Sequence, residues 1–198
     1  MADTSGEDYA ERLTTLQGRR WKSLLGAQLP YRWNVRRLMA GRDEVLDVGC
    51  GIGRNLDHLG RGVGVDHNAA AVATARAAGH RAWTTEQWPS CPDAVPGRYD
   101  ALLLAHVLEH LQPAEADALI AAYLPYLAPA ARIVAICPQE RGYASDATHV
   151  RFLDLTAMSQ ALRGWGFTPV RTFSFPLPRA AGKSFTYNEF VVAADRRA

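Results

Sequence analysis

Residues 45–66 read VLDVGCGIGRNLDHLGRGVGVD, and the order of residue types in this stretch decides the fold. The apolar residues 45–48 predict a buried strand, and three glycines at alternate positions within 49–53 predict a sharp turn. A helix is expected near Arg54–Leu59, and the next apolar run, Gly62–Val65, predicts a second strand. A strand, a turn, a helix and another strand in succession are typical of the βαβ unit of a parallel sheet.

The chain from Glu44 onward repeats this alternation of short apolar runs and helical patterns. Further strands are expected at Arg81–Thr84, Ala101–Ala105, Arg132–Ile136, Phe167–Phe173 and Phe190–Ala194, and helices from Asn68 to Ala78, from Pro113 to about Tyr126 and over Leu155–Arg163. No full helix separates the last two strands, so they are predicted to form an antiparallel hairpin at the sheet edge. The sequence thus predicts a doubly wound α/β domain over residues 44–198, preceded by a helical cap or lid over residues 1–43.

The composition is that of an ordinary globular domain. Of the 198 residues 48% are hydrophobic, and 22 basic against 20 acidic residues leave a net charge of +2. That balance gives no support to a general nucleic-acid or membrane-surface binder. The polar N-terminus lacks a signal-peptide pattern, and no apolar run approaches the roughly 18 residues of a membrane span, so a cytoplasmic protein is expected. The cysteines, Cys50, Cys91 and Cys137, form no CxxC pair, which argues against a disulfide framework.

The glycine turn and Asp66 together predict a nucleoside site. Glycines allow a sharp turn and let a ligand lie against bare main chain. The pattern is G-x-G-x-G, and Arg54 stands where the dinucleotide fingerprint has its third glycine, while no Gly-Lys-Ser/Thr follows to make a P-loop. Asp66, at the end of the second strand, is placed to accept hydrogen bonds from both hydroxyls of a ribose. The alternative is a tight turn beside a surface aspartate.

These segments resemble the class I S-adenosylmethionine-dependent methyltransferases. VLDVGCGIGRNLDHL…GVGVDHN is similar to the opening of that family, YDALLLAHVLEHL to its fourth-strand motif and RIVAICP to its fifth. The likeness covers about residues 44–195 and implies a Rossmann-like, seven-stranded sheet with an antiparallel last strand. It also implies S-adenosylmethionine as cofactor, with the glycine loop along its methionine part, Asp66 on its ribose and residues 86–88 beside its adenine. The candidate cofactor residues are Asp47, Gly49, Gly51, Gly53, Arg54, Asp66, Glu86, Trp88 and Ala105.

The segment from His106 to His110, which reads HVLEH, follows the predicted fourth strand. It matches the inverted zincin pattern H-x-x-E-H, but a zincin carries that pattern inside a long helix, which argues against a peptidase here. On a helical turn His106, Glu109 and His110 are expected to share one face, since residues three and four apart are neighbours. Two imidazoles and a carboxylate with open positions suit a catalytic divalent cation. The alternative is that the segment braces the loop under the cofactor without a metal.

A long polar loop, residues 138–152, follows the fifth strand and contains Glu140, Asp146 and His149. It leaves the same sheet edge as the HVLEH segment, where α/β proteins bind ligands. The arrangement is similar to the small-RNA 3′-terminal ribose 2′-O-methyltransferases, which hold a magnesium ion on an acidic-x-x-Glu-His segment and a later His, and to the ubiquinone-pathway catechol O-methyltransferases. His106 departs from those families, which have Glu at this position. The resemblance implies a divalent cation, with magnesium favoured, held by His106, Glu109, His110 and His149.

Methyl transfer to a hydroxyl needs a general base within hydrogen-bond reach or a cation that lowers the pKa of the hydroxyl. His149 and His106 are the candidate bases, because an imidazole titrates near neutral pH. Glu140 is the reserve base if both histidines bind the cation. For Glu140 and Asp146 the alternative is that they only order the loop.

Two segments bear on the acceptor. Residues 21–37 mix arginine with aromatic residues, and the tail SFPLPRAAGKSFTYNEFVV resembles methyltransferases of bacterial polysaccharide and glycoconjugate pathways. Aromatic faces can hold sugar rings, although they also occur in ordinary packing. Together with a cation that grips adjacent hydroxyls, this favours a saccharide O-methyltransferase acting on a small-molecule or oligosaccharide acceptor.

Other functions stay open at this point. They are a catechol or quinol O-methyltransferase, an RNA 3′-terminal ribose 2′-O-methyltransferase, and a non-catalytic S-adenosylmethionine-binding module. A nucleic-acid acceptor is disfavoured, because a chain of 198 residues with a net charge of +2 leaves no room for an added RNA-binding domain. A homo-oligomer is compatible with the sequence, which does not fix the oligomeric state.

Overall fold

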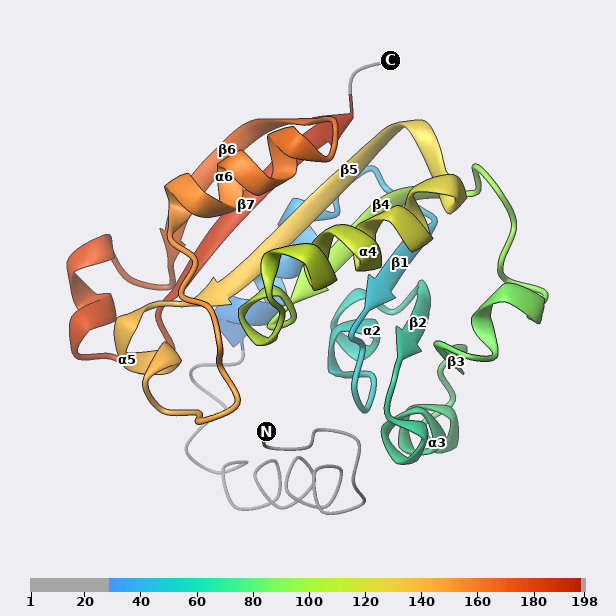
Figure 1. The fold of residues 1–198 in the computed structure, drawn as a ribbon. Coiled ribbons are helices and arrows are strands. Elements are labelled where there is room, and N and C mark those ends of the chain that lie inside the picture. The colour runs from blue at the N-terminus through green and yellow to red at the C-terminus, as the bar shows by residue number, and fades with distance from the viewer. Residues whose placement is uncertain (1–28, 197–198) are drawn as a thin grey trace. The chain divides into compact units, whose positions relative to one another are not determined.

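The computed structural model describes residues 29–196, and expectations that concern residues 1–28 lie outside this range. The chain divides into two compact units, Met1–Ala94 and Val95–Ala198. Its seven strands form one mixed sheet (Figure 1). No helix in the described range is long and apolar enough to cross a membrane. The predicted division at residue 44, with a cap or lid before it, stays a prediction.

The first unit contributes three parallel strands. Its described elements are a helix over residues 29–38, β1 (Val45–Val48), α2 (Arg54–Leu59), β2 (Val63–Asp66), α3 (Ala69–Ala77), β3 (Ala82–Thr84) and a 3₁₀ turn at Trp88–Ser90. Strand β2 pairs with both β1 and β3. Valines dominate β1 and β2, which are buried along their whole length, as in strands covered on both faces. Asn68 begins α3, because its side chain accepts a hydrogen bond from the backbone of Ala71.

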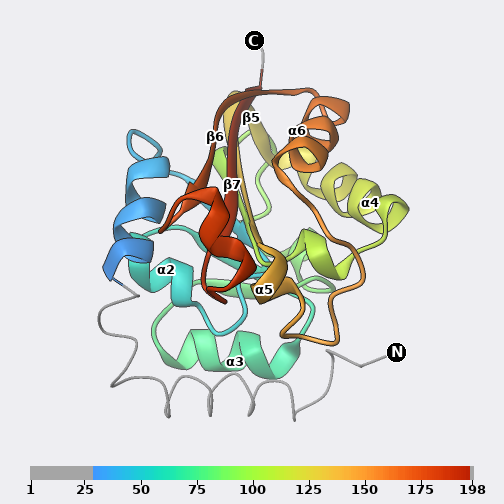
Figure 2. The same cartoon turned by 90° about the vertical axis from the view of Figure 1, so that its left-hand side faces the viewer.

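The second unit contributes the other four strands, in the order β4-β5-β7-β6. Its elements are β4 (Tyr99–Ala105), a 3₁₀ turn at Leu108–His110, α4 (Pro113–Tyr123), a 3₁₀ turn at Leu124–Tyr126, β5 (Leu127–Pro138), α5 (Glu140–Tyr143), α6 (Leu155–Gly164), β6 (Phe167–Phe175), a 3₁₀ turn at Arg179–Lys183 and β7 (Glu189–Arg196). Strands β4 and β5 are parallel, whereas β7 runs antiparallel to both β5 and β6. Helices α4 and α6 lie on the same side of these strands (Figure 2).

The predicted alternation of strands and helices is confirmed, and so is the antiparallel last strand. The boundaries differ where neighbouring residues decide them. The predicted helix from Pro113 to Tyr126 ends at Tyr123, because Pro125 has no N–H to continue the α-helical hydrogen bonds. The short helix α5 was not expected inside the polar loop. It places Glu140 at its first position.

The HVLEH segment does not form the expected helical turn. Only Leu108–His110 is a 3₁₀ turn, and His106 precedes it with a φ of 60°. The backbone N–H of His106 still donates to the carbonyl of Ile136, at 2.9 Å, so this residue continues the pairing of β4 with β5. The prediction that His106, Glu109 and His110 share one helical face is therefore wrong, because the chain changes direction at His106.

Candidate functional site

The loop between β1 and α2 presents bare main chain. Gly49, Gly51 and Gly53 have φ values of 78°, 52° and 89°, in the left-handed region that favours glycine. A Cβ at Gly51 would meet no atom within 4 Å, whereas a Cβ at Gly53 would lie 2.6 Å from the ring of His80. The space beside Gly51 is therefore open to a ligand, and Gly53 is needed for close packing.

Asp66 ties this loop to the end of β2. Its Oδ2 accepts a hydrogen bond of 2.7 Å from the backbone N–H of Gly51, and its Oδ1 accepts one of 2.8 Å from that of Asn68. Each carboxylate oxygen has two lone pairs, so the group keeps capacity for further donors. The side chain is held where the sequence predicts a ribose-binding carboxylate.

Asp47, in the middle of β1, is a fully buried carboxylate. The side chains of Asn55 and Arg54 lie near enough to favour its charged form, but neither oxygen of Asp47 makes a hydrogen bond of ordinary geometry among the described residues. Burial, reinforced by the negative charge of Asp66, raises the pKa of Asp47 to about 7. A buried charge without a partner is unfavourable, and a ligand cation would relieve this. The ammonium group of S-adenosylmethionine is such a cation, so the residues present fit this cofactor.

The other candidate cofactor residues are less defined by the structure. The guanidinium of Arg54 lies 5.2 Å from the ring centroid of Tyr31. Trp88 is buried and Glu86 is exposed, so their assignment to the adenine stays a prediction. Ala105 is buried at the end of β4 in the second unit, and its cofactor contact also stays a prediction.

Gly51 offers a direct test of the open space in the loop. Replacing it with alanine is expected to lower the affinity for S-adenosylhomocysteine about tenfold or more, since the Cβ would occupy the ligand's space. Gly60→Ala is the matched control, because Gly60 also has a positive φ, 69°, and open space around a Cβ. Both variants carry a similar backbone strain of about 1 kcal/mol. Isothermal titration should show weakened binding for Gly51→Ala alone; equal affinities would contradict a ligand at Gly51.

In the second unit, Glu109, His110 and His149 come together. Their candidate ligand atoms, one from each side chain, all lie within 4.8 Å of one another. The loop that carries His149 is held on the turn after β4, because the N–H groups of Val150 and Arg151 both donate to the carbonyl of Glu109. Of the four residues predicted to hold a cation, the structure thus brings three together, and the fourth, His106, lies outside this group.

Backbone carbonyls orient both imidazoles of this group. The Nδ1 of His149 is 2.7 Å from the carbonyl oxygen of Tyr143, and the Nδ1 of His110 is 3.2 Å from that of Thr148. A carbonyl can only accept, so each Nδ1 carries a proton, and Nε2 is the nitrogen of each ring that has the lone pair in the neutral form. Burial lowers the pKa of His110 and keeps its ring neutral. Histidines that ligate metals are oriented in this way.

Glu109 supplies the carboxylate of the group and is 1% exposed. Burial opposes its ionisation, but the contact with His106 outweighs burial and lowers the pKa of Glu109. Its Oε1 lies 3.2 Å from the Nδ1 of His106, and the buried thiol of Cys137 also lies against this carboxylate. The group therefore combines one carboxylate with two imidazoles, a donor set suited to a divalent cation.

His106 lies between two carboxylates and outside this group. Its Nδ1 faces Glu109, and its Nε2 is 2.8 Å from the Oε1 of Glu189. Burial disfavours the charge of the ring, but the two carboxylates outweigh burial and raise the pKa of His106 to about 10. A ring protonated on both nitrogens has no lone pair for a cation or for an incoming proton. The structure thus does not bring His106 into the three-residue group, and its roles as ligand and base stay predictions.

Glu189 is the residue that the sequence motifs did not select. It is the first residue of β7 and pairs with Pro138 at the end of β5. The only signal was a charged side chain at the start of an otherwise apolar strand. Its carboxylate meets a histidine 83 positions earlier in the chain, which no local pattern reveals.

Glu140 and Asp146 have structural partners. Two guanidinium nitrogens of Arg179 contact the carboxylate of Glu140, one of them at 2.9 Å, and this pairing lowers the pKa of Glu140. A carboxylate engaged in this way is a weak base, so the structure does not favour the reserve role. Asp146 accepts hydrogen bonds from the backbone and the hydroxyl of Thr148, at 2.9 and 2.8 Å, and thereby orders the loop.

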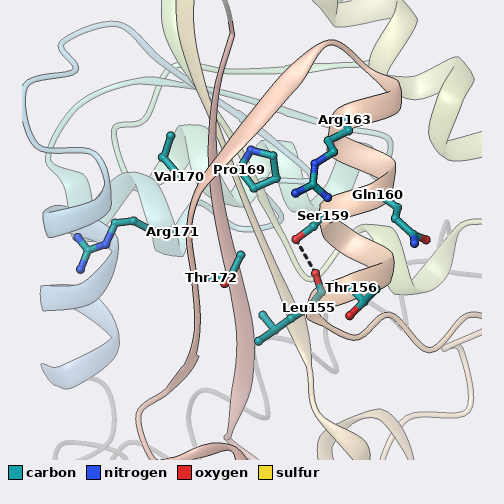
Figure 3. Close-up of a pocket in the computed structure, with 9 residues that line it drawn as sticks. All are labelled: Leu155, Thr156, Ser159, Gln160, Arg163, Pro169, Val170, Arg171 and Thr172. Atoms are coloured by element: carbon teal, nitrogen blue, oxygen red, sulfur yellow. Dashed lines mark hydrogen bonds between the residues drawn. The ribbon is translucent and has the colours of Figure 1, made fainter.

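A separate cavity of about 430 Å³ lies between α6 and β6 (Figure 3). The side chain of Arg163 points toward Ser159 in this cavity, whereas Arg171 points away from it. The lining residues are Leu155, Thr156, Ser159, Gln160, Arg163, Pro169, Val170, Arg171 and Thr172. None of them is a residue that the sequence selected.

Comparison with known proteins places these features in a family. A family model described as a methyltransferase domain matches residues 19–172. A search of curated proteins finds no match. Among solved structures, an S-adenosylmethionine-dependent methyltransferase from Archaeoglobus fulgidus is similar, with a TM-score of 0.65 and 18% identity over 84% of this chain and 93% of that one.

Two further structures cover the whole of this chain. A putative methyltransferase from Haloferax volcanii, in complex with the Trm112 methyltransferase activator, has a TM-score of 0.69 and 15% identity, with 98% of that chain covered. The 1,6-didemethyltoxoflavin-N1-methyltransferase from Burkholderia thailandensis, with its substrate and S-adenosylhomocysteine bound, has a TM-score of 0.62 and 20% identity, with 92% covered. At these identities the likeness shows the fold.

Proposed function

The chain belongs to the methyltransferase-domain family and is an S-adenosylmethionine-dependent methyltransferase, and from this premise we propose that it methylates a hydroxyl group with the help of a divalent cation. The observation that carries the proposal is the convergence of Glu109, His110 and His149 within 4.8 Å. Three protein ligands leave coordination positions open for an acceptor. A divalent cation held by these three residues would lower the pKa of an acceptor hydroxyl.

The chain's own residues divide the remaining work. Asp47 and the main chain at Gly51 bind the amino-acid part of the cofactor, and Asp66 binds its ribose. The carbonyls of Tyr143 and Thr148 keep the Nε2 lone pairs of His149 and His110 available. Methyl transfer forms the bond from the acceptor oxygen to carbon as the bond from carbon to the sulfonium sulfur breaks. The hydroxyl proton passes to solvent water, either directly or by way of an imidazole of this site. This proton loss is the step that the three-residue group assists.

Aromatic rings beside His149 support a saccharide as the acceptor. Tyr143 stacks on the ring of His149, with 5.3 Å between centroids, and Phe152 packs against Tyr143 edge to face. Phe152 is 40% exposed, so part of its ring is accessible to a ligand. Aromatic faces hold the apolar side of sugar rings, and adjacent sugar hydroxyls suit a cation with open positions. A catechol, which also has adjacent hydroxyls and a flat apolar ring, is the second candidate.

Methyl-transfer assays on a panel of acceptors test this function. The protein is treated with EDTA and given S-adenosylmethionine with mannosides, glucosides, catechols or RNA 3′ ends, with and without magnesium. We expect magnesium-dependent release of S-adenosylhomocysteine with a glycoside. Turnover that is equal in EDTA would remove the cation from the proposal, and magnesium-dependent turnover of a catechol alone would replace the saccharide. Cofactor binding without turnover of any acceptor would indicate a binding module.

A further inference from the structure

The contacts of Glu189 and His106 explain how a buried carboxylate is held ready for a cation. We propose that Glu189, acting through His106, is a positioning residue that fixes Glu109 as the anionic ligand of the cation site. This inference rests on the proposed function, since it concerns the same site. It assigns a role to β7, and it replaces the predicted role of His106 as a ligand.

A continuous chain of contacts supports this role. The Oε1 of Glu189 is 2.8 Å from the Nε2 of His106, and the Nδ1 of His106 is 3.2 Å from the Oε1 of Glu109. Both neighbours are carboxylates, and the imidazole lies between them and links them. Because Oε1 of Glu109 faces His106, this contact holds the carboxylate in one orientation, and Oε2 is the oxygen that does not face the imidazole.

The start of β7 is rigidly placed, so Glu189 is a fixed support. Its side chain is 10% exposed. Its backbone carbonyl accepts a hydrogen bond of 2.9 Å from the side chain of Gln139, which is fully buried. The same Gln139 donates its backbone N–H to the carbonyl of Asn188, at 3.0 Å. A shift of the backbone at Glu189 would break these hydrogen bonds.

The unusual backbone conformation of His106 agrees with a side chain that its contacts hold in a fixed position. In the described range it is the one non-glycine residue with a positive φ, 60°. Residues in this region are somewhat strained and persist where surrounding contacts hold them. The two carboxylates on either side of the ring are such contacts. Each nitrogen of the His106 ring faces a carboxylate oxygen, so neither points to the three-residue group, and Glu109 is the member of this chain of contacts that belongs to it.

Manganese binding to variants of the full chain tests the inference. The variants are Glu189→Gln, His106→Asn and their combination, measured by isothermal titration of Mn²⁺ in the presence of S-adenosylhomocysteine. Asparagine tolerates the positive φ of His106, so it removes the ring with little backbone strain. We expect each single variant to lower Mn²⁺ affinity about 10- to 100-fold, as loss of an outer-shell partner does. The double variant should have about the same Mn²⁺ affinity as the single variant with the lower affinity, because both residues act through one path.

Controls separate positioning from folding. Asp117→Asn changes a carboxylate to an amide in the same unit, and its remaining oxygen can still accept from Trp165, so Mn²⁺ affinity should stay as in the wild type. Glu189→Asp keeps the charge on a shorter side chain and should fall between the wild type and Glu189→Gln. S-adenosylhomocysteine affinity should be unchanged in all variants.

Several outcomes would overturn the inference. If the Glu189→Gln variant binds Mn²⁺ with the wild-type affinity, whether or not its melting temperature is lower, the role of Glu189 is merely structural. Losses that multiply in the double variant would show that Glu189 does not act through His106. A wild-type protein that binds no Mn²⁺ would overturn the proposed cation site first, and this inference with it.

Discussion

Replacing Asp47 with asparagine is expected to lower the affinity for S-adenosylhomocysteine about a hundredfold, and at the same time to raise the melting temperature of the cofactor-free protein by about 3 °C or more. Asp47 is fully buried, and its oxygens make no hydrogen bond of ordinary geometry among the described residues. The amide has nearly the same shape without the charge, so the variant removes the unfavourable burial of a carboxylate. It also removes the anion that we propose holds the cofactor's ammonium group.

The pH dependence of this gain follows from the pKa of Asp47. In the folded protein that pKa is about 7, against an ordinary value of 3.8. The folded state therefore holds the proton more tightly than the unfolded chain, and the carboxylate destabilises the fold increasingly as the pH rises from about 4 to about 7. The difference in melting temperature between Asp47→Asn and the wild type should be larger at about pH 8 than at about pH 5.

Cofactor affinity should show the complementary trend. In the wild type a proton competes with the cofactor's ammonium group for Asp47, so affinity should fall as the pH drops below about 7, and Asp47→Asn should lack this dependence. Asp57→Asn is a suitable control, because Asp57 lies on α2 with a side chain that is 68% exposed. A variant at Asp47 that is less stable at pH 8 and binds the cofactor normally would contradict this account.

Replacing His149 with alanine is expected to lower kcat about a thousandfold while leaving the affinity for S-adenosylhomocysteine unchanged. His149 belongs to the three-residue group. The Tyr143 carbonyl engages its Nδ1, which leaves Nε2 as the ring nitrogen that can act at the site. Its loss removes either a cation ligand or the acceptor of the hydroxyl proton. Steady-state kinetics at saturating magnesium and acceptor, together with cofactor titration, measure both quantities.

The result separates an enzyme from a binding module. Asp117→Asn, in the same unit, should keep the wild-type kcat. A His149→Ala variant with kcat within about threefold of the wild type would place the chemistry elsewhere, because a single catalytic acid–base group is worth far more than that. Loss of cofactor binding in the same variant would instead indicate a general loss of the fold.

Local patterns were sufficient to predict the sheet. The run Val45–Val48 and the glycines after it define a strand and a turn within a few residues, and both are present. The joining of Glu109 with His149 was also predictable, because β4 and β5 are parallel neighbours and loops at their carboxyl ends meet at one edge. These inferences needed only the order of elements along the chain.

The roles of single side chains at the site depended on distant partners. By sequence Glu140 is a plausible base, but Arg179, 39 positions later, pairs with its carboxylate. His106 matched a ligand pattern, but Glu189 lies 83 positions away and pairs with it through the antiparallel strand β7. The register of β7 against β5 determines which side chain reaches His106, and the sequence alone does not fix that register.

The most direct test of the cation site is an anomalous difference map at the manganese absorption edge, from crystals grown with Mn²⁺ and S-adenosylhomocysteine. The account predicts one peak about 2.0–2.4 Å from an oxygen of Glu109 and from the Nε2 atoms of His110 and His149, the distances typical of such ligands. It also predicts His106 outside the coordination sphere, in contact with Glu189. A map without a peak at these three residues, or with His106 as a ligand, would contradict it.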